Sequence, residues 1–375
     1  MKVQEVILDS NKKRYLLIDE KGFPVIPVAK YLKYIDNSEK SYNTQKTYCY
    51  SLKLYFEYLK EIDLDYKDIN INILIKFIEW LRNPYGSSKV VNMKLTKAKR
   101  SEKTVNLIIT VIINFYDYLY RTKEINDTTD KLTRQFDSKY RKYKDFLYHI
   151  NKDKALDKNI LKIKEPKRKI NILTREQMLL VYNATTNIRD KFLIKLLFET
   201  GFRIGEALSL FIEDIIFDHN KGHKIRLVDR GELPNGSKLK TGGREIHISQ
   251  ELIDLFDDYA YEVLDELEID TNFIFVKIKG RNKGHPLEYQ DVSDLFKRLK
   301  KKTGIDIHAH LLRHTHATIF YKATKDIKQV QERLGHSQIQ TTISMYLHNS
   351  EDDIRKNWGI AQSAFRLTEG DTNDK

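Results

Sequence analysis

Three short segments near the end of the chain and one from its middle set the architecture that we expect. They read His310-Leu311-Leu312-Arg313-His314, Leu334-Gly335-His336, the single residue Tyr346 and, upstream, Thr200-Gly201-Phe202-Arg203-Ile204-Gly205-Glu206. Each residue alone says little, since the chain of 375 residues contains 22 tyrosines. Their order and spacing say more. Two arginines, two histidines and a tyrosine are suited to attack a phosphodiester with a tyrosine hydroxyl.

Arg203 and Arg313 are the candidate phosphate ligands. Phosphodiester transfer passes through a pentacoordinate state with extra negative charge on two non-bridging oxygens, and a planar guanidinium can bind two oxygens at once. Arg203 follows a glycine turn at the start of a predicted helix, and Arg313 lies on another helix. The two could therefore form a preorganised clamp. The alternative for Arg203 is a surface ion pair with Glu206, three residues further along its helix.

Two further residues fit proton transfer. His310 precedes Arg313 by three residues, so both would lie on one helical face, where His310 could accept the nucleophile's proton or bind the phosphate. Lys240, in the glycine-flanked segment Lys240-Thr241-Gly242, could reach into a DNA minor groove and protonate the departing 5′ oxygen. Lys238 is the alternative for that role.

The last two candidates lie close to the C-terminus. His336 follows a predicted helix end and could donate a hydrogen bond to the phosphate or support the tyrosine. Tyr346 would be the nucleophile, because a tyrosine hydroxyl reacts well only where neighbouring positive charge or a base assists it. A packed aromatic residue is the alternative for Tyr346.

In this order the segments resemble the motifs of the tyrosine recombinases, also called phage integrases. The matching pieces are Gly201-Phe202-Arg203-Ile204-Gly205-Glu206, Lys240-Thr241-Gly242, His310-Leu311-Leu312-Arg313-His314, Leu334-Gly335-His336 and Tyr346. The resemblance is close over residues 172–350 and rests on helical pattern alone over 41–122. Within the family, the layout is most like transposon-encoded recombinases of the transposase A type.

The resemblance implies an enzyme that cleaves DNA through a 3′-phosphotyrosyl intermediate and exchanges strands through a Holliday junction, to integrate or excise a mobile element. It implies no metal, ATP or other cofactor. The implied partners are double-stranded DNA, accessory recombination proteins, and further copies of the chain in a tetramer on two duplexes. The apolar C-terminal helix expected at 352–367 would pack on a neighbouring protomer or on its own domain. The implied catalytic set is Arg203, Lys240, His310, Arg313, His336 and Tyr346.

The pattern of apolar residues predicts a mainly α chain with a small β-sheet. We expect an N-terminal appendage (1–40), a helical core-type DNA-binding domain (41–122), a basic insertion or linker (123–171), a catalytic domain (172–367) and a tail (368–375). The resemblance implies a SAM-like fold for the helical domain, an α+β fold for the catalytic domain, and a C-shaped clamp on DNA.

Periodicity and capping signals place the individual elements. The predicted helices cover 28–35, 43–62, 71–81, 101–121, 187–200 and 250–267, with more helices after 290, and the predicted strands cover 224–229, 245–249 and 273–276. The helix at 187–200 is expected to be strongly amphipathic and to end at Gly201. A capping box at Thr174-Arg175-Glu176-Gln177 opens the catalytic domain. Glu20-Lys21-Gly22 is a plausible turn of a hairpin between residues 15–19 and 23–26.

Charge points to a polyanionic partner. The net charge is +13, and residues 131–170 hold 14 Lys and Arg against 5 Asp and Glu. Such a local excess favours nucleic acid, although a lysine-rich proteome is the alternative explanation. The candidate DNA-binding residues are Lys94, Lys97, Lys99, Arg100, Lys164, Lys167, Arg168 and Lys169.

The remaining composition bears on the compartment. The sequence shows neither a long apolar run nor the N-terminus of a secreted protein, so we expect no membrane partner. Its single cysteine, Cys49, fits a reducing environment. We therefore expect a bacterial cytoplasmic protein, associated with the nucleoid when it binds DNA.

The sequence leaves four alternatives to this function. His308, His310, His314 and His316 could bind zinc, but Arg313 among them would repel a cation. A metal-dependent transposase would need clustered carboxylates, which no spacing singles out. A DNA-binding regulator could have kept the fold and lost the chemistry. A type IB topoisomerase would share the tyrosine attack but would relax supercoils instead of joining two sites.

Overall fold

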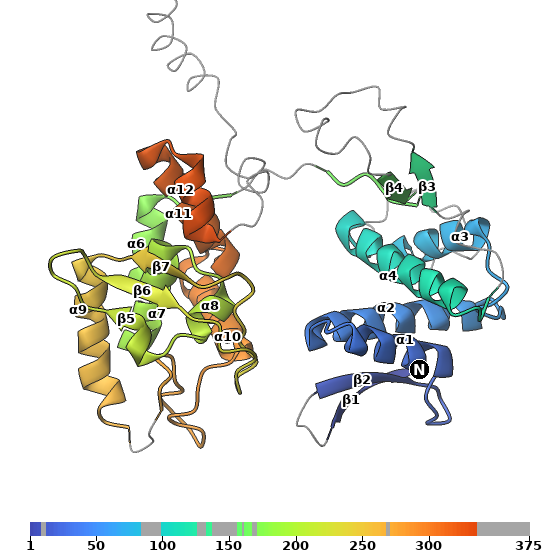
Figure 1. The fold of residues 1–375 in the computed structure, drawn as a ribbon, viewed down its shortest axis with the longest axis horizontal. Helices are drawn as coiled ribbons and strands as arrows, with labels where there is room; N and C mark the ends of the chain where they lie inside the picture. Colours follow the sequence, from blue (N-terminus) through green and yellow to red (C-terminus); the bar gives the residue numbers. More distant parts are fainter. Residues whose placement is uncertain are drawn as a thin grey trace, which may run out of the picture. The chain divides into compact units, whose positions relative to one another are not determined.

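The computed structural model describes residues 1–8, 13–83, 99–125, 133–136, 156–159, 161–166, 171–267 and 271–335. The chain divides into two units, Met1–Lys167 and Arg168–Lys375, and both consist mainly of helices with small antiparallel sheets (Figure 1). Every helix in these ranges is too short or too polar to cross a membrane.

The N-terminal unit is built on four helices. They are α1 (Ile26–Asn37), α2 (Tyr42–Glu61), α3 (Ile71–Arg82) and α4 (Glu102–Arg121). The side chains of Ser41, Asn70 and Ser101 each accept a hydrogen bond from the backbone N–H three residues on, which starts α2, α3 and α4. Inside, the hydroxyls of Tyr55 and Tyr116 lie 2.7 Å apart and are buried. All four helices predicted for this half of the chain are confirmed within a few residues.

The first 40 residues share the core of this unit. Strand β1 (Lys2–Ile7) pairs antiparallel with β2 (Lys13–Ile18), and Leu17 is buried in the same cluster as residues of α1, α2 and α4. The turn at residues 19–23 is present, with the Asp19 N–H donating to Phe23 O over 2.8 Å. Of the hairpin expected on either side of it, the turn and one antiparallel bridge, between Ile18 and Pro24, are present, and the Val25 N–H donates to Leu17 O over 2.9 Å. Residues 23–26 form no strand, and the full-length partner of β2 is β1.

The stretch expected as a basic insertion or linker, residues 123–171, returns to the N-terminal unit. Ile125 and Leu161 are both buried in its core, and the Asn106 side chain donates to Ile163 O (2.9 Å) while accepting from the Ile163 N–H (2.8 Å). Strands β3 (Thr133–Phe136) and β4 (Leu156–Asn159) pair antiparallel between these anchors. Ile163 and Glu165 are therefore held against α4 by hydrogen bonds to Asn106.

The C-terminal unit surrounds a central helix. Its elements are α6 (Arg175–Asn183), α7 (Ile188–Thr200), α8 (Ile204–Leu208), the 3₁₀ helix η2 (Ile212–Asp214), β5 (Ile215–Ile216), β6 (Lys224–Leu227), β7 (Arg244–His247), α9 (Gln250–Tyr259), the π-helix η3 (Ala260–Leu264), α10 (Tyr289–Thr303), α11 (Ala309–Thr324) and α12 (Ile327–Leu334). The capping box at Thr174 and Gln177 is confirmed, as is Gly201 at the end of α7, with a φ of 67°.

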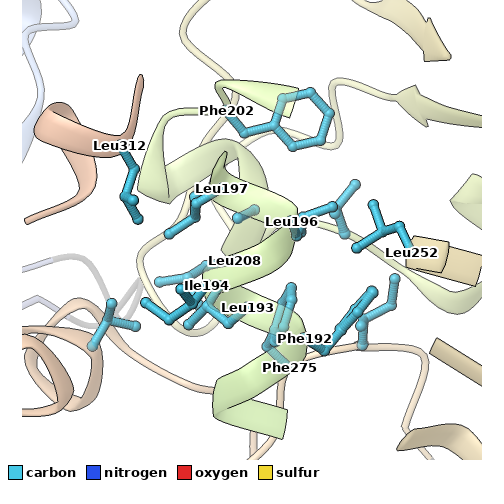
Figure 2. Packing of buried hydrophobic residues seen from close by; sticks show 14 of the residues in the cluster. Phe192, Leu193, Ile194, Leu196, Leu197, Phe202, Leu208, Leu252, Phe275 and Leu312 are labelled. Atoms are coloured by element: carbon cyan, nitrogen blue, oxygen red, sulfur yellow. The ribbon is translucent and has the colours of Figure 1, made fainter. Parts of the chain in front are cut away.

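Helix α7 is more buried than expected. Figure 2 shows its side chains Phe192, Leu196 and Leu197 among apolar residues from several other elements. The prediction of a strongly amphipathic helix is wrong, because α6, α8, α9 and α11 all contact α7 and leave none of its residues fully exposed. Even Asp190 is buried, in an ion pair with Arg189.

The sheet of this unit has the order β5-β6-β7, with all neighbours antiparallel. The strands predicted at 224–229 and 245–249 correspond to β6 and β7, whereas β5 was not predicted. The strand expected at 273–276 is not formed. Its residues make single bridges with two different segments, Phe273 with Phe211 and Val276 with Pro286, so no continuous ladder arises.

Candidate active site

The structure describes four of the six predicted catalytic residues. Arg203 is the N-cap residue of α8, Lys240 is exposed in the loop between β6 and β7, and His310 and Arg313 lie on α11. His336 and Tyr346 lie outside the described residues. Helix α12 ends at Leu334, and Gly335 follows in the left-handed conformation with a φ of 63°, so the described chain stops immediately before His336.

A buried carboxylate, that of Glu206, organises the site. Only 1% of its side chain is exposed. Its oxygens accept from Arg203 Nη1 (2.9 Å) and from Arg244 Nη2 (3.0 Å), and Arg313 Nη1 lies 3.8 Å away. The pair between Arg203 and Glu206 considered from the sequence is therefore present, but it belongs to a buried network that joins three arginines and is not a surface ion pair.

The charges of this network act on Glu206 itself. Burial alone would raise the pKa of its carboxyl, but Arg244, the Arg203 backbone N–H and Arg313 together lower it below its ordinary value. Glu206 is therefore ionised at neutral pH. Three guanidinium groups share this one negative charge, which leaves the described site with excess positive charge.

The two predicted arginines converge on one point. Arg203 Nη1 lies 3.4 Å and Arg313 Nη2 2.6 Å from the same atom, the carbonyl oxygen of Leu334. Arg313 is nearly buried and also donates to Gly201 O over 2.7 Å. Arg203, by contrast, keeps a quarter of its side chain exposed. Segments more than one hundred residues apart in sequence therefore bring both guanidinium groups within reach of a single anion.

The same group of cations affects the pKa of His310. It is exposed on α11, and the partial desolvation of its ring lowers its pKa below the ordinary value; the charges of Arg313, His308, Arg203 and Lys240 lower it further. The imidazole is thus held neutral, the form that can accept a proton.

The histidine cluster does not form a zinc site in the described chain. His316 is buried, with Nδ1 3.1 Å from Phe198 O and Nε2 accepting from Arg333 Nε over 3.2 Å, so both ring nitrogens are engaged. His308 Nδ1 accepts from the Leu311 N–H at the start of α11. Within the described ranges, no group of three histidine, cysteine or carboxylate side chains is arranged to hold a metal ion.

His316 makes the stability of this unit depend on pH. Burial, with help from Arg333 and Arg313, lowers its pKa from 6.5 to about 3. Between these values the unfolded chain binds a proton that the folded chain excludes, so the stabilisation is complete above pH 6.5 and is lost as the pH falls toward 3. This group alone should contribute a slope of about 1.4 kcal/mol per pH unit.

Urea titrations of the wild type and of His316→Gln at about pH 7 and about pH 5 test this slope. Glutamine can donate to Phe198 O and accept from Arg333, but it does not titrate. The variant should lose less stability than the wild type on acidification. An equal loss in the two proteins would contradict the assignment.

The predicted DNA-binding residues are only partly described. Lys99 and Lys164 are exposed, and Arg100 is half-buried, donating to Leu81 O (3.0 Å) with its guanidinium 5.9 Å from the centre of the Trp80 ring. Arg100 therefore also ties the end of α3 to the start of α4. The other predicted residues, Lys94, Lys97, Lys167, Arg168 and Lys169, lie outside the described residues.

Two residues of the site were missed as participants. Glu206 was considered only as a partner of Arg203, although an acidic residue next to a predicted cluster of cations was a usable signal. Arg244 closes the loop that carries Lys240, and nothing in its local sequence shows that it reaches Glu206. That contact joins residues 38 positions apart and requires the fold.

Comparisons with known proteins bear on this geometry. Residues 171–353 match the model of the phage integrase family. Transposase A from transposon Tn554 of Staphylococcus aureus is 40% identical over 358 residues, which cover 95% of this chain and 96% of that protein. Two solved structures share the fold. The Tn1549 transposon integrase in complex with transposon right end DNA has a TM-score of 0.60 at 18% identity, with 90% of this chain and 98% of that one covered. The XerH site-specific recombinase bound to its difH substrate has a TM-score of 0.59 at 19% identity, with 89% and 84% covered.

Proposed function

Because the chain belongs to the phage integrase family, whose tyrosine recombinases cleave and rejoin DNA, we propose that Tyr346 is its nucleophile and that Arg203 and Arg313 hold the phosphodiester under attack. The chain is a site-specific recombinase of the type encoded by mobile elements. Tyr346 would form a bond to the phosphorus and release the 5′ oxygen, which leaves a 3′-phosphotyrosyl link. A 5′ hydroxyl from the partner strand would then reverse the step and join the strands through a Holliday junction.

One observation carries this proposal: two guanidinium groups meet at one atom, and three share a single buried carboxylate. The scissile phosphate brings one negative charge, and a second develops on its non-bridging oxygens in the transition state. A preorganised group of cations stabilises that state more than the ground state. The hydrogen bonds of the Arg203 side chain within the described chain all leave from Nη1, so its remaining donors suit a phosphate oxygen.

The other residues take the proton-transfer roles. Neutral His310 would accept the proton of the Tyr346 hydroxyl or donate to the phosphate, and Lys240 would give a proton to the departing 5′ oxygen. His336 is two residues after Leu334, on whose carbonyl the arginines meet, and would donate to a phosphate oxygen. None of these roles needs a metal ion or another cofactor.

The wider assembly is part of the same proposal. Residues 41–122, whose core is shared with residues 1–40 and Leu161, would form the core-type DNA-binding domain, and residues 172–367 would form the catalytic domain. The two would bind double-stranded DNA as a clamp. The basic stretch at 123–171 would add contacts to phosphates. Four copies would hold two duplexes, with the C-terminal segment seated on a neighbouring protomer and accessory proteins assisting. The reaction would take place on the DNA of the bacterial cytoplasm.

A nicked duplex that carries an end of the protein's own mobile element tests the function. When the bond next to the nick is cleaved, the short fragment that carries the new 5′ hydroxyl diffuses away, and the protein remains attached to the 3′ phosphate of the other fragment. We expect an SDS-resistant adduct that forms equally well with Mg²⁺ and with excess EDTA. Guanidinium groups would stabilise the negative charge on the phosphate, a task that metal ions perform in metal-dependent nucleases. Loss of the adduct in EDTA would contradict the proposal.

A further inference from the structure

Arg244 is bound in a way that sets it apart from the other arginines of the site. Its Nε donates to Arg333 O (3.0 Å). Nη1 donates to Thr241 Oγ1 (3.0 Å) and Glu206 Oε1 (3.3 Å), and Nη2 to Glu206 Oε2 (3.0 Å) and Leu334 O (3.4 Å). A guanidinium has five N–H donors, and each of these has an acceptor within the protein. Arg244 therefore has no donor left for a phosphate, and its effect on the reaction must pass through the groups it holds.

One of these groups lies next to the proposed general acid. The Thr241 hydroxyl accepts from Arg244 Nη1 and donates to Glu206 Oε1, at 3.0 Å in each case. On the other side of Lys240, Leu239 is buried in the core of the unit. The backbone of Lys240 is thus fixed at both neighbours, while its side chain is exposed.

Arg244 also fixes where this loop lies relative to α12. Its bonds to Arg333 O and Leu334 O cap the last turn of that helix, whose carbonyls lack partners within the helix. The contact is close: a Cβ on Gly335 would lie 2.8 Å from Arg244 Nη1 and 3.0 Å from Thr241 Oγ1, so a larger residue there would displace these side chains. The loop, the buried Glu206 and the end of α12 therefore meet on one guanidinium group.

We propose that Arg244 and Thr241 are positioning residues that hold Lys240 where it protonates the departing 5′ oxygen. This inference rests on the proposed function. In the cleavage step the Tyr346 hydroxyl gives its proton to His310 and its oxygen forms a bond to phosphorus. The bond from phosphorus to the 5′ oxygen breaks, and the Lys240 ammonium transfers a proton to that oxygen. A displaced Lys240 slows the departure of an oxygen leaving group. It matters much less for a sulfur leaving group, because a thiolate departs without being protonated.

Single-turnover cleavage of two nicked duplexes tests the inference. One duplex carries the ordinary 5′ oxygen at the scissile position, and the other carries sulfur there. Thr241→Val removes the hydroxyl and keeps the shape of the side chain. Arg244→Lys keeps the charge beside Glu206 but cannot reach Thr241, Glu206 and both carbonyls at once. Lys240→Ala is the reference for complete loss of the acid.

The control is Arg230→Lys. Arg230 is also an arginine of this unit with little exposure, bound to Asp214 Oδ1 (2.8 Å) and Glu213 (2.9 Å), and its partners include neither Thr241 nor α12. Thermal melting and DNA binding of all variants are measured in parallel. The control shows how much cleavage rate and stability are lost when a partly buried arginine network far from Lys240 is disturbed.

On the oxygen substrate, Thr241→Val and Arg244→Lys should cleave about 10- to 100-fold more slowly than the wild type, as displacement of a catalytic group predicts. On the sulfur substrate the loss of cleavage rate relative to the wild type should be smaller by about tenfold or more, because the general acid is no longer needed. Lys240→Ala should show the same reduction of its deficit. For Arg230→Lys, the cleavage rate relative to the wild type should be the same on both substrates. The inference is overturned if Thr241→Val and Arg244→Lys slow both substrates equally, or neither. A wild type that forms no adduct on either substrate would refute the proposed function itself.

Discussion

Replacement of Tyr346 by phenylalanine is expected to abolish the covalent protein–DNA adduct completely. Phenylalanine keeps the aromatic ring and removes the oxygen that would bond to phosphorus. The variant should therefore bind DNA as tightly as the wild type and trap none of it in an SDS gel with the nicked duplex. Phenylalanine offers no other nucleophilic atom, so we expect no residual strand cleavage above background.

Tyr321→Phe provides the matched control. Tyr321 lies on α11, the helix that also carries His310 and Arg313, and its ring is 5.9 Å from Lys325 Nζ. Loss of the Tyr321 hydroxyl should leave adduct formation at the wild-type level. An adduct that persists in Tyr346→Phe would show that another residue is the nucleophile.

The structure explains why several other tyrosines are poor candidates. Tyr55 and Tyr116 are buried in the N-terminal unit and bonded to each other, and Tyr259 donates to Ile274 O over 2.7 Å. Burial raises the pKa of each of these hydroxyls above the ordinary value. Their protons are harder to remove, and DNA cannot approach them.

The second large effect is expected for Arg203→Lys. Lysine keeps the charge but offers one compact ammonium group in place of a planar fork. It cannot bind Glu206, lie near the Leu334 carbonyl and also hold a phosphate oxygen. Single-turnover cleavage should fall about 100- to 1,000-fold, as for loss of one preorganised donor to a transition state, whereas DNA binding should change little.

Arg226→Lys is the control for this substitution. Arg226 lies on β6, with 56% of its side chain exposed, and pairs with the exposed Glu245. An exposed pair of this kind contributes little to stability, and the variant should cleave at the wild-type rate. Cleavage by Arg203→Lys at a rate close to that of Arg226→Lys would remove Arg203 from the phosphate site.

Local signals were sufficient to predict much of the fold. The helices that start at Ser41, Ser101 and Thr174 carry their own caps, and Gly201 ends α7 where a left-handed residue is needed. Such signals act over a few residues and can be read directly from the sequence. The order of Arg203, Arg313 and Tyr346 also depends only on the sequence.

Features that depend on distant partners were not predictable. Helix α7 contains polar residues that suggested a solvent-facing side, but elements far along the chain cover it. Residues 273–276 look like a strand, and whether a strand forms depends on a neighbour that pairs along its full length. The role of Glu206 emerges only when Arg244 and Arg313 reach it from β7 and α11.

The central claim is that Arg203 neutralises charge on the scissile phosphate. The most direct test compares wild type and Arg203→Ala on two nicked duplexes, one with the natural phosphate and one with a methylphosphonate, in which a methyl group replaces a non-bridging oxygen and removes the negative charge. If Arg203 acts on that charge, its loss should slow cleavage of the natural substrate by about 100-fold or more and matter far less on the neutral one. An equal deficit on both substrates would contradict the account.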